Sequence, residues 1–570
     1  MPRSFPATAV ESDTSERWRP RLLKGGAIVV LALALNLAGN ARTSLWDRDE
    51  PRYAGCVREM RARQDWVHPT FNAEPRYQKP IFIYWVMRLG VAVGGDNPYG
   101  ARLVSAVAGA ATCLLVWRLG TRIFGPRAGW LAALMLATAP IMVVESKLAT
   151  TDATLALLLV GCQFCLWELG QRPSRGLAAL FWVLISLATL VKGPVGPALI
   201  ASAGVASWWS GGPAVCWRRL HWRWGLTAFA ALTAPWYIAV GLVSNGTFFR
   251  VAFGQQVVTR LTTEMEQHGG FPGYYLATSL AAFHPWVAFL PAAILGAFAR
   301  RREQPAFGFL LGWVIGPLVL LELVQTKMVH YFLPAYPACA LLAAWLVVAV
   351  VRDEVNLRRW ALGRLGIGLL GGFGIGGAVA LLAAACVVPS PVRWPCLALG
   401  LVIGGGTLYG LERLMSGATE RAVAGLVATW AAVGLGVGAW LAPAVEPYKM
   451  ARVVAERLNA LAGSTNAQPI LFSYQEPSTI YAMGRPTPAV RTWPELHEKL
   501  RQHGEMIAPA LPEECVGLSH RPELIVEVVD HLEGFNITKG KTQTLDFVRI
   551  RMRPESVPMI AGDVSSRVVR

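Results

Sequence analysis

Acidic, basic and aromatic residues that could do chemistry cluster directly after the first long apolar run. The cluster is Trp46-Asp47-Arg48-Asp49-Glu50-Pro51-Arg52-Tyr53, and Tyr77-Gln78-Lys79-Pro80 lies a short distance downstream. Carboxylates can act as general bases, and Lys and Arg can stabilise negative charge. A solvated loop with weak surface ion pairs is the alternative interpretation. Because charges at the end of a membrane span are costly and usually functional, we favour a site.

Further polar residues lie at the ends of later apolar runs, in the same predicted compartment as this cluster. Taken singly, each is more typical of a structural role, such as a hydrogen bond at a helix end. Their shared compartment favours a common function. These residues are Glu145, Lys147, Asp152, Lys192, Lys327, His330 and Tyr336.

The composition indicates that membrane-spanning elements must position these residues. The chain has 570 residues, of which 54% are apolar and only 16% are charged, whereas an average soluble domain is about 25% charged. This excludes a disordered chain, a disulfide scaffold and an ordinary soluble globule of this length. The formal net charge of +17 would suggest a nucleic-acid partner if the protein were soluble.

Thirteen apolar runs of helical length predict a polytopic α-helical membrane protein. One set of connections between the runs carries twenty-two Lys and Arg residues, and the alternate short connections carry six. The positive-inside rule therefore predicts a cytoplasmic N-terminus, an outer-face cluster and an outer C-terminus. The basic residues thus set the orientation and do not indicate a nucleic-acid partner. The runs are roughly 25–42, 103–124, 128–144, 153–170, 176–191, 195–210, 225–244, 275–299, 306–325, 331–351, 365–388, 395–411 and 423–445.

Two regions lie outside the apolar runs. The first outer loop, about 43–102, contains a predicted surface helix at 51–64 and a second interfacial helix at 81–93. We expect a transmembrane catalytic domain over 1–447 and a small outer α/β domain over 448–570. In this tail the patterns predict a helix from Met450 to Leu461, helices at 478–483 and 494–502, and strands at 470–474, 524–529 and 547–552.

The motifs of the chain resemble those of the lipid-linked GT-C glycosyltransferases. Three segments of this chain resemble the first-loop signature of that family. They are Asp49-Glu50-Pro51-Arg52-Tyr53-Ala54, Asp65-Trp66 with Pro69, and Tyr77-x-Lys79-Pro80-Ile81. Its later motifs resemble Lys192-Gly193-Pro194 and His330-Tyr331-x-Leu333-Pro334-x-x-Pro337. The motifs cover about residues 43–340, and the topology extends the resemblance over the whole chain. Gln78 departs from the pattern, because close relatives often carry Glu there.

The resemblance implies a multi-pass enzyme of the bacterial inner membrane that works at the periplasmic face. Within the family, the chain looks most like the transferases that move 4-amino-4-deoxy-L-arabinose from undecaprenyl phosphate to lipid A, which lowers surface negative charge and confers polymyxin resistance. The implied partners are the undecaprenyl phosphate-linked sugar, lipid A and membrane lipids, and the implied state is a monomer. No cofactor is certain, and a divalent metal ion such as zinc or magnesium stays open.

The resemblance also implies roles for individual residues. Asp49, Asp152 and Lys79 are the candidate catalytic residues. Lys79 and Arg52 would stabilise the phosphate leaving group in a low-dielectric setting. Asp49 would be the base for a hydroxyl acceptor, or would position the sugar or acceptor if the acceptor is an ionised phosphate. Residues expected to bind the donor phosphate or substrate are Arg52, Tyr53, Tyr77, Lys192, Arg250, Arg260, His330 and Tyr336.

Two alternative functions stay open at this point. One is a transferase of the same superfamily that moves a mannose-type sugar from a polyprenyl phosphate to protein or another glycan. The other is a lipid or sugar transporter. Transporters usually show internal repeats and broken helices at the bilayer midplane. No repeat is obvious in this sequence, and the charged cluster lies at a predicted membrane surface, so the transporter is the weaker alternative.

Overall fold

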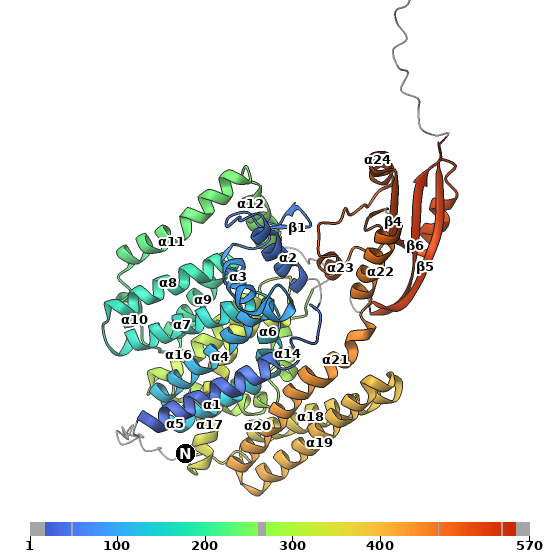
Figure 1. Ribbon diagram of the computed structural model, residues 1–570. Coiled ribbons are helices and arrows are strands. Elements are labelled where there is room, and N and C mark those ends of the chain that lie inside the picture. Colours follow the sequence, from blue (N-terminus) through green and yellow to red (C-terminus); the bar gives the residue numbers. More distant parts are fainter. Residues whose placement is uncertain (1–17, 47–48, 260–268, 466, 537–539, 555–570) are drawn as a thin grey trace, which may run out of the picture. The chain divides into compact units, whose positions relative to one another are not determined.

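The computed structural model describes residues 18–46, 49–259, 269–465, 467–536 and 540–554. These residues form two compact units (Figure 1). The helical unit comprises residues 1–43, 60–69 and 75–445, and the α/β unit comprises residues 44–59, 70–74 and 446–570. The predicted site residue Arg260 lies outside the described residues.

The helical unit is built from helices that follow the predicted apolar runs (Figure 1). In chain order they are α1 (Trp18–Leu37), α3 (Phe82–Gly94), α4 (Pro98–Phe124), α5 (Pro126–Thr138), α6 (Pro140–Lys147), α7 (Asp152–Gln171), α8 (Arg175–Lys192), α9 (Val195–Trp209), α10 (Val215–Arg218), α11 (Trp222–Val243), α12 (Thr247–Phe249), the π-helix η1 (Arg250–Thr259), α14 (Tyr274–Ala282), η2 (Trp286–Phe289), α15 (Leu290–Arg300), α16 (Pro305–Glu322), η3 (Val329–Ala335), α17 (Tyr336–Val351), α18 (Ala361–Val387), α19 (Ser390–Ser416), α20 (Thr419–Gly436), the π-helix η4 (Val437–Leu441) and α21 (Ala442–Val445).

The prediction of a polytopic helical membrane protein is confirmed. In the described part of the chain, nine helices are long and apolar enough to cross a membrane, and the pair α5 and α6, bent by 59°, would make a tenth. The segments Leu22–Leu37, Val195–Trp209 and Trp286–Arg300 are shorter apolar helices that coincide with three more of the predicted runs. The total of thirteen spans therefore stays a prediction, although every predicted run is helical.

Small residues let the helices of this unit approach closely. A Cβ on Gly120 of α4 would lie 2.7 Å from the Cα atom of Gly129 in α5. A Cβ on Gly316 of α16 would lie 2.2 Å from the backbone oxygen of Ser202 in α9. Such contacts bring backbones together where lipid provides no hydrophobic driving force between helices. Glycine is therefore required at both crossings.

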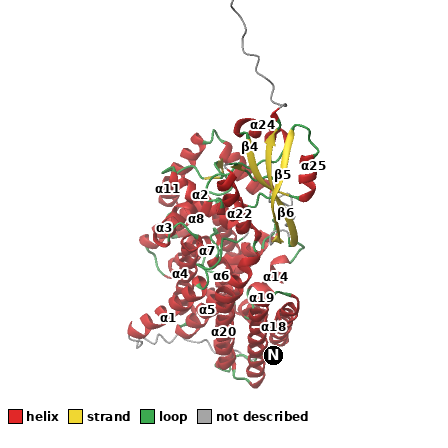
Figure 2. Ribbon diagram, turned by 45° about the vertical axis from the view of Figure 1, so that its right-hand side comes forward, coloured by secondary structure: helices red, strands yellow, loops and turns green. Residues whose placement is uncertain are grey.

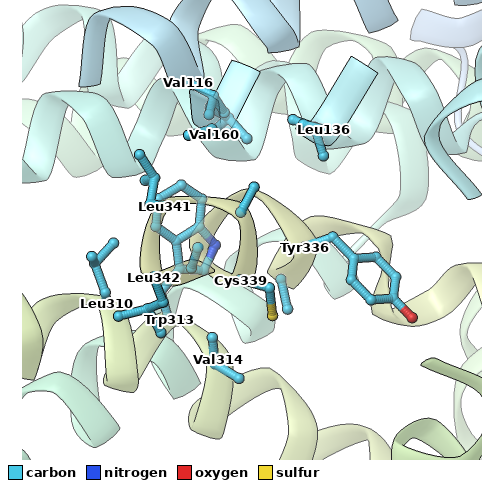
Figure 3. Packing of buried hydrophobic residues seen from close by; sticks show 14 of the residues in the cluster. Val116, Leu136, Val160, Leu310, Trp313, Val314, Tyr336, Cys339, Leu341 and Leu342 are labelled. Atoms are coloured by element: carbon cyan, nitrogen blue, oxygen red, sulfur yellow. The ribbon is translucent and has the colours of Figure 1, made fainter. Parts of the chain in front are cut away.

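The core of the helical unit surrounds α17 (Figure 3). Leu341 and Leu342 are fully buried. On one side they face Val116 of α4, Leu136 of α5 and Val160 of α7, and on the other Leu310, Trp313 and Val314 of α16. The Trp313 indole nitrogen donates a hydrogen bond to the Pro334 carbonyl at 2.8 Å. This bond ties α16 to η3, which carries one wall of the site described below.

The α/β unit contains a four-stranded sheet with the order β3-β4-β6-β5 (Figure 2). Strand β4 pairs in parallel with β3 and antiparallel with β6, and β5 pairs antiparallel with β6. The strands are β3 (Gln468–Pro469), β4 (Glu505–Ala510), β5 (Leu524–Asn536) and β6 (Lys541–Met552), and the helical elements are η5 (Glu446–Tyr448), α22 (Met450–Thr465), α23 (Pro477–Ala482), α24 (Trp493–His503) and α25 (Pro512–Ser519). The predicted α/β character is confirmed, but the sequence patterns missed β4 and α25. The strand predicted at 470–474 is wrong, because β3 covers only Gln468–Pro469 and Leu471 forms an isolated bridge with Ala489.

Alternating side chains divide the core of the α/β unit into two layers. Ile507 of β4 and Phe547 of β6 pack with Leu458 of α22. The next residue on each strand, Ala508 and Val548, packs instead in a second cluster. That cluster includes Leu496 and Leu500 of α24 and Leu518 of α25. One helix layer therefore covers each face of the sheet.

Segments that the sequence assigned to the first outer loop fold with the tail. Helix α2 (Asp49–Ala62) begins in the α/β unit, and the short strands β1 (Thr70–Phe71) and β2 (Glu74–Pro75) follow it. The Arg58 guanidinium donates to the Tyr481 carbonyl at 2.8 Å and lies 3.9 Å from the centre of the Tyr481 ring. The Asn72 side chain exchanges two hydrogen bonds with the Thr487 backbone, at 2.8 and 2.7 Å.

Candidate active site

A cavity of about 140 Å³ in the helical unit gathers several of the predicted site residues. Lys79 reaches it from the segment before α3, Asp152 from the start of α7 and Lys192 from the end of α8. Tyr331 of η3 completes the polar part of the lining, together with Gln78. These residues are far apart in sequence, so the helical packing alone brings them together.

Asp152 and Lys192 form a buried ion pair at the centre of this polar wall. The Lys192 Nζ atom lies 2.6 Å from Asp152 Oδ1, and the two side chains are 10% and 9% exposed. The Thr151 hydroxyl donates to the other carboxylate oxygen at 3.1 Å. The ammonium also lies 5.0 Å from the centre of the Tyr331 ring, within cation–π range. The pair therefore holds a cation at the cavity wall.

The ends of α7 and α8 explain why these two residues stand here. Asp152 is the first residue of α7, and a carboxylate is stabilised at a helix N-terminus. Lys192 is the last residue of α8, where the helix dipole favours a cation. Gly193 then adopts a φ of +63°, a conformation that favours glycine, and ends the helix. The Lys192-Gly193-Pro194 motif thus ends α8 at the cavity wall.

His330 and Glu145 extend the polar wall behind Asp152. His330 Nε2 lies 3.9 Å from Asp152 Oδ2, and His330 Nδ1 lies 3.9 Å from Glu145 Oε1. Both separations exceed hydrogen-bond distance but allow electrostatic interaction when the imidazole is protonated. Glu145 lies on α6 and is buried, whereas His330 is half-buried. The structure therefore places His330 near Asp152, while the substrate-binding role predicted for His330 stays a prediction.

The remainder of the cavity wall is apolar and aromatic. It includes Val195, Leu199, Phe248, Phe253 and Leu321. Such a wall excludes water and lowers the local dielectric constant, which strengthens the field of the nearby ammonium groups. Sequence reasoning did not single out Tyr237, Phe248 or Phe253, although their aromatic side chains near the outer end of the predicted 225–244 span were the available signal.

Tyr77 lies directly before the cavity residue Gln78. Its hydroxyl is 2.7 Å from His68 Nε2, and its ring packs edge-on against Phe248 with ring centres 6.0 Å apart. Burial raises the pKa of Tyr77 and lowers the pKa of His68. Both groups are therefore neutral at pH 7, and their contact supports the segment that carries Lys79.

Two other predicted residues of the helical unit do not line this cavity. The Tyr336 hydroxyl lies 3.0 Å from Ser279 Oγ, and its ring stacks on Phe283, so the side chain is part of the core. Arg250 begins η1 and is exposed, with Nη2 donating to Thr247 Oγ1 at 3.1 Å. Their assigned roles stay predictions that this cavity does not support.

Asp49, Arg52 and Tyr53 belong to the α/β unit, at the start of α2. Asp49 Oδ1 lies 3.9 Å from Arg52 Nη1, and their side chains are 51% and 31% exposed. Tyr53 is buried. Glu50, which is buried beside them, accepts a hydrogen bond from the Trp46 backbone nitrogen at 2.6 Å. The acids of this motif therefore stabilise the N-terminal turn of α2.

The chemistry of the cavity wall does not fit a resident metal ion. Across the described ranges, no group of three or more His, Cys, Asp or Glu side chains is arranged to hold one. At the cavity, the Asp152 carboxylate is engaged by an ammonium group at 2.6 Å, and position 78 carries an amide in place of a carboxylate. We therefore derive no step through a metal.

Comparisons with known proteins identify the family of this chain. A family model described as dolichyl-phosphate-mannose-protein mannosyltransferase matches residues 78–238, which include the Lys79, Asp152 and Lys192 positions. An undecaprenyl phosphate-alpha-4-amino-4-deoxy-L-arabinose arabinosyl transferase of Pseudomonas paraeruginosa is 30% identical over 443 residues, covering 74% of this chain and 76% of the relative.

Solved structures share the fold. The crystal structure of ArnT from Cupriavidus metallidurans bound to undecaprenyl phosphate matches with a TM-score of 0.74 and 22% identity, covering 94% of this chain and 98% of that chain. The oligosaccharyltransferase of Archaeoglobus fulgidus matches with a TM-score of 0.50 and 13% identity, covering 84% and 65%. With the fold, the motifs and the extent of the identity in agreement, the chain belongs to the family of undecaprenyl phosphate–α-4-amino-4-deoxy-L-arabinose arabinosyl transferases, which are glycosyltransferases.

Proposed function

We propose that the protein transfers 4-amino-4-deoxy-L-arabinose from undecaprenyl phosphate to a phosphate group of lipid A. The family relationship supports the sugar and the lipid carrier. The single structural observation that carries the proposal is the pairing of Lys192 with Asp152 in a cavity whose remaining wall is mostly apolar. Such a site suits a phosphate anion attached to an isoprenoid chain.

The reaction needs stabilisation of a leaving phosphate more than it needs a base. A lipid A phosphate oxygen attacks the anomeric carbon, a new C–O bond forms, and the C–O bond to the polyprenyl phosphate breaks. The second pKa of a phosphate is about 6, so this acceptor is mostly ionised at pH 7 and needs no general base. Lys79 and Lys192 would stabilise the departing anion, because fixed cations act strongly in a water-poor site. We expect inversion at the anomeric carbon from this single displacement.

Asp152 would act as a positioning residue for Lys192. Its carboxylate holds the ammonium at 2.6 Å, and the Thr151 hydroxyl orients the second carboxylate oxygen. His330 would add positive charge to this wall when protonated. The roles assigned to Asp49 and Arg52, positioning the sugar or acceptor and binding phosphate, stay predictions. Asp49 could do so by pairing with the ammonium group of the sugar.

We further propose that the enzyme works as a monomer in the bacterial inner membrane, with the cavity on the periplasmic side. The alternation of basic and neutral connections supports this orientation. The N-terminus would then be cytoplasmic and the α/β unit periplasmic. The reaction would lower the negative charge of lipid A at the cell surface. It would thereby reduce the binding of cationic peptides such as polymyxin.

Mass spectrometry of lipid A tests the proposal, because it reports the sugar and the acceptor together. The gene would be expressed in a bacterium that makes the undecaprenyl phosphate–aminoarabinose donor but lacks its own transferase. We expect lipid A to gain the mass of one aminoarabinose residue, and Lys192→Ala to abolish that gain. Unchanged lipid A despite correct membrane insertion of the protein would contradict the proposal and favour a different acceptor or sugar.

A further inference from the structure

A second cavity lies among α5, α17 and α20 of the helical unit, which pack side by side (Figure 1). It measures about 350 Å³, within the range of about 300–1,000 Å³ that ligand pockets occupy. It shares no lining residue with the candidate active site. Its wall is largely apolar and includes Trp130, Leu134, Val347 and Val427. The transfer reaction proposed above makes no use of this cavity.

Three charged side chains line the cavity where the helices begin or end. Arg127 lies in the first turn of α5, Arg352 directly follows α17, and Glu420 lies in the first turn of α20. All three are exposed. Arg352 Nη1 and Glu354 Oε1 form an exposed ion pair at 4.0 Å, beyond hydrogen-bond distance, which a ligand phosphate can replace. The cavity thus presents two cations, one anion and an apolar interior.

The charge pattern determines which kind of molecule fits. Two guanidinium groups suit a phosphate, since each presents several donors in a planar fork. The Glu420 carboxylate, which lines the same cavity, suits an ammonium group. The apolar interior suits a hydrocarbon chain. A zwitterionic aminophospholipid carries a phosphate, an ammonium group and hydrocarbon chains. The positive-inside rule assigns the helix ends that line the cavity to the cytoplasmic membrane surface.

We propose that this cavity binds one acyl chain of an ethanolamine-type phospholipid from the cytoplasmic leaflet. Arg127 and Arg352 hold the phosphate, and Glu420 holds the ammonium group. Phosphatidylglycerol would satisfy the two arginines through its phosphate, but its neutral glycerol headgroup would leave Glu420 without an ammonium partner. Basic pockets between helices on the cytoplasmic side are a known mode of headgroup recognition, and the carboxylate here adds selectivity for the amine.

Native mass spectrometry of the full-length protein, incubated with equal amounts of phosphatidylethanolamine and phosphatidylglycerol, tests this site. We expect the wild-type protein to retain phosphatidylethanolamine about tenfold more strongly, because only this lipid offers Glu420 an ammonium group for a charge-assisted hydrogen bond. Arg127→Gln/Arg352→Gln should lose most of the retained lipid. Glu420→Gln should retain lipid but lose the preference. Ala424→Phe, at a lining position, should displace the acyl chain while leaving every charge in place.

The matched control is Arg118→Gln/Arg302→Gln, which removes two exposed arginines outside the cavity, one on α4 and one in the turn after α15. This variant should bind lipid as the wild-type protein does. Equal retention by the Arg127→Gln/Arg352→Gln protein would overturn the site, as would loss of lipid in the control variant to the same extent. A wild-type preference for phosphatidylglycerol would overturn the role of Glu420 and with it the assigned lipid.

Discussion

Each unit contains an ion pair between an Asp and a basic residue. The two pairs show how burial changes the contribution of an ion pair to stability and function. In the helical unit, Asp152 and Lys192 lie 2.6 Å apart and are about nine-tenths buried. In the α/β unit, Asp49 and Arg52 lie 3.9 Å apart and are 51% and 31% exposed. Removing one partner of a buried pair leaves an uncompensated charge, whereas an exposed pair contributes little. From the sequence, all four residues were candidate site residues, with Asp49 and Arg52 ahead of Asp152 and Lys192.

The largest effect should come from breaking the buried pair. Lys192→Ala should lower the free energy of unfolding by about 3–5 kcal/mol, because it strands the Asp152 carboxylate in the apolar wall. It should also abolish sugar transfer. Thermal unfolding of the purified protein in detergent and a transfer assay measure the two effects.

The double variant Asp152→Asn/Lys192→Met is the control for this experiment. It removes both charges, so it should recover most of the lost stability. Transfer should stay absent, since the Lys192 ammonium no longer faces the leaving phosphate and Lys79 alone remains. Recovery of activity together with stability would show that the pair is structural only. The buried and the exposed pair would then differ in stability but not in their role in catalysis.

Lys79→Ala should reduce the rate of transfer by about 100- to 1,000-fold, the cost of removing one preorganised electrostatic group. Lys79 lines the same cavity, but its ammonium is not the partner in the Asp152 ion pair at 2.6 Å, which Lys192 makes. Unfolding curves of Lys79→Ala, taken beside those of Lys192→Ala, separate the loss of rate from any loss of stability. A rate within threefold of the wild-type protein would remove Lys79 from the leaving-group site.

Asp49→Asn should change the free energy of unfolding by at most about 1 kcal/mol, because its ion pair is exposed. If Asp49 positions the sugar or the acceptor, the variant should nevertheless lose sugar transfer. Lipid A mass spectra and unfolding curves, taken on the same preparations, separate the two effects. Arg52→Ala serves as the matched variant, since it breaks the same ion pair from the other side. Normal transfer by Asp49→Asn would restrict the α2 motif to a structural role.

The smallest effect concerns His68, which contacts Tyr77 next to the cavity segment. Burial lowers the pKa of His68 in the folded protein. The imidazole therefore binds a proton more readily in the unfolded state, where its pKa is about 6.5. The free energy of unfolding therefore has its full value above about pH 6.5. It falls as the pH drops from about 6.5 through the lower pKa of His68 in the folded protein. Unfolding at pH 7.5 and pH 5.5 should show a smaller difference in His68→Gln. An equal difference in both proteins would rule out this contribution.

Part of the α/β unit could not be predicted from local patterns. Strand β4 is buried at five consecutive positions and contains Pro509, so it lacks the alternation that marks a half-buried strand. Its neighbours β3 and β6 cover both of its edges. The association of residues 44–59 and 70–74 with the tail also escaped prediction, because it depends on contacts such as Arg58 with Tyr481, more than four hundred residues later.

By itself, the sequence determined the membrane class, the places of the apolar helices and the motifs that contain Lys79, Lys192 and His330. These follow from local composition and spacing, which hydrophobic burial translates directly into helices. Only the tertiary structure decided that Asp152 is the partner of Lys192, that Phe248 and Phe253 enclose them, and that Tyr336 belongs to the core. These relations depend on which helix ends meet, and helix packing sets that through contacts between distant residues.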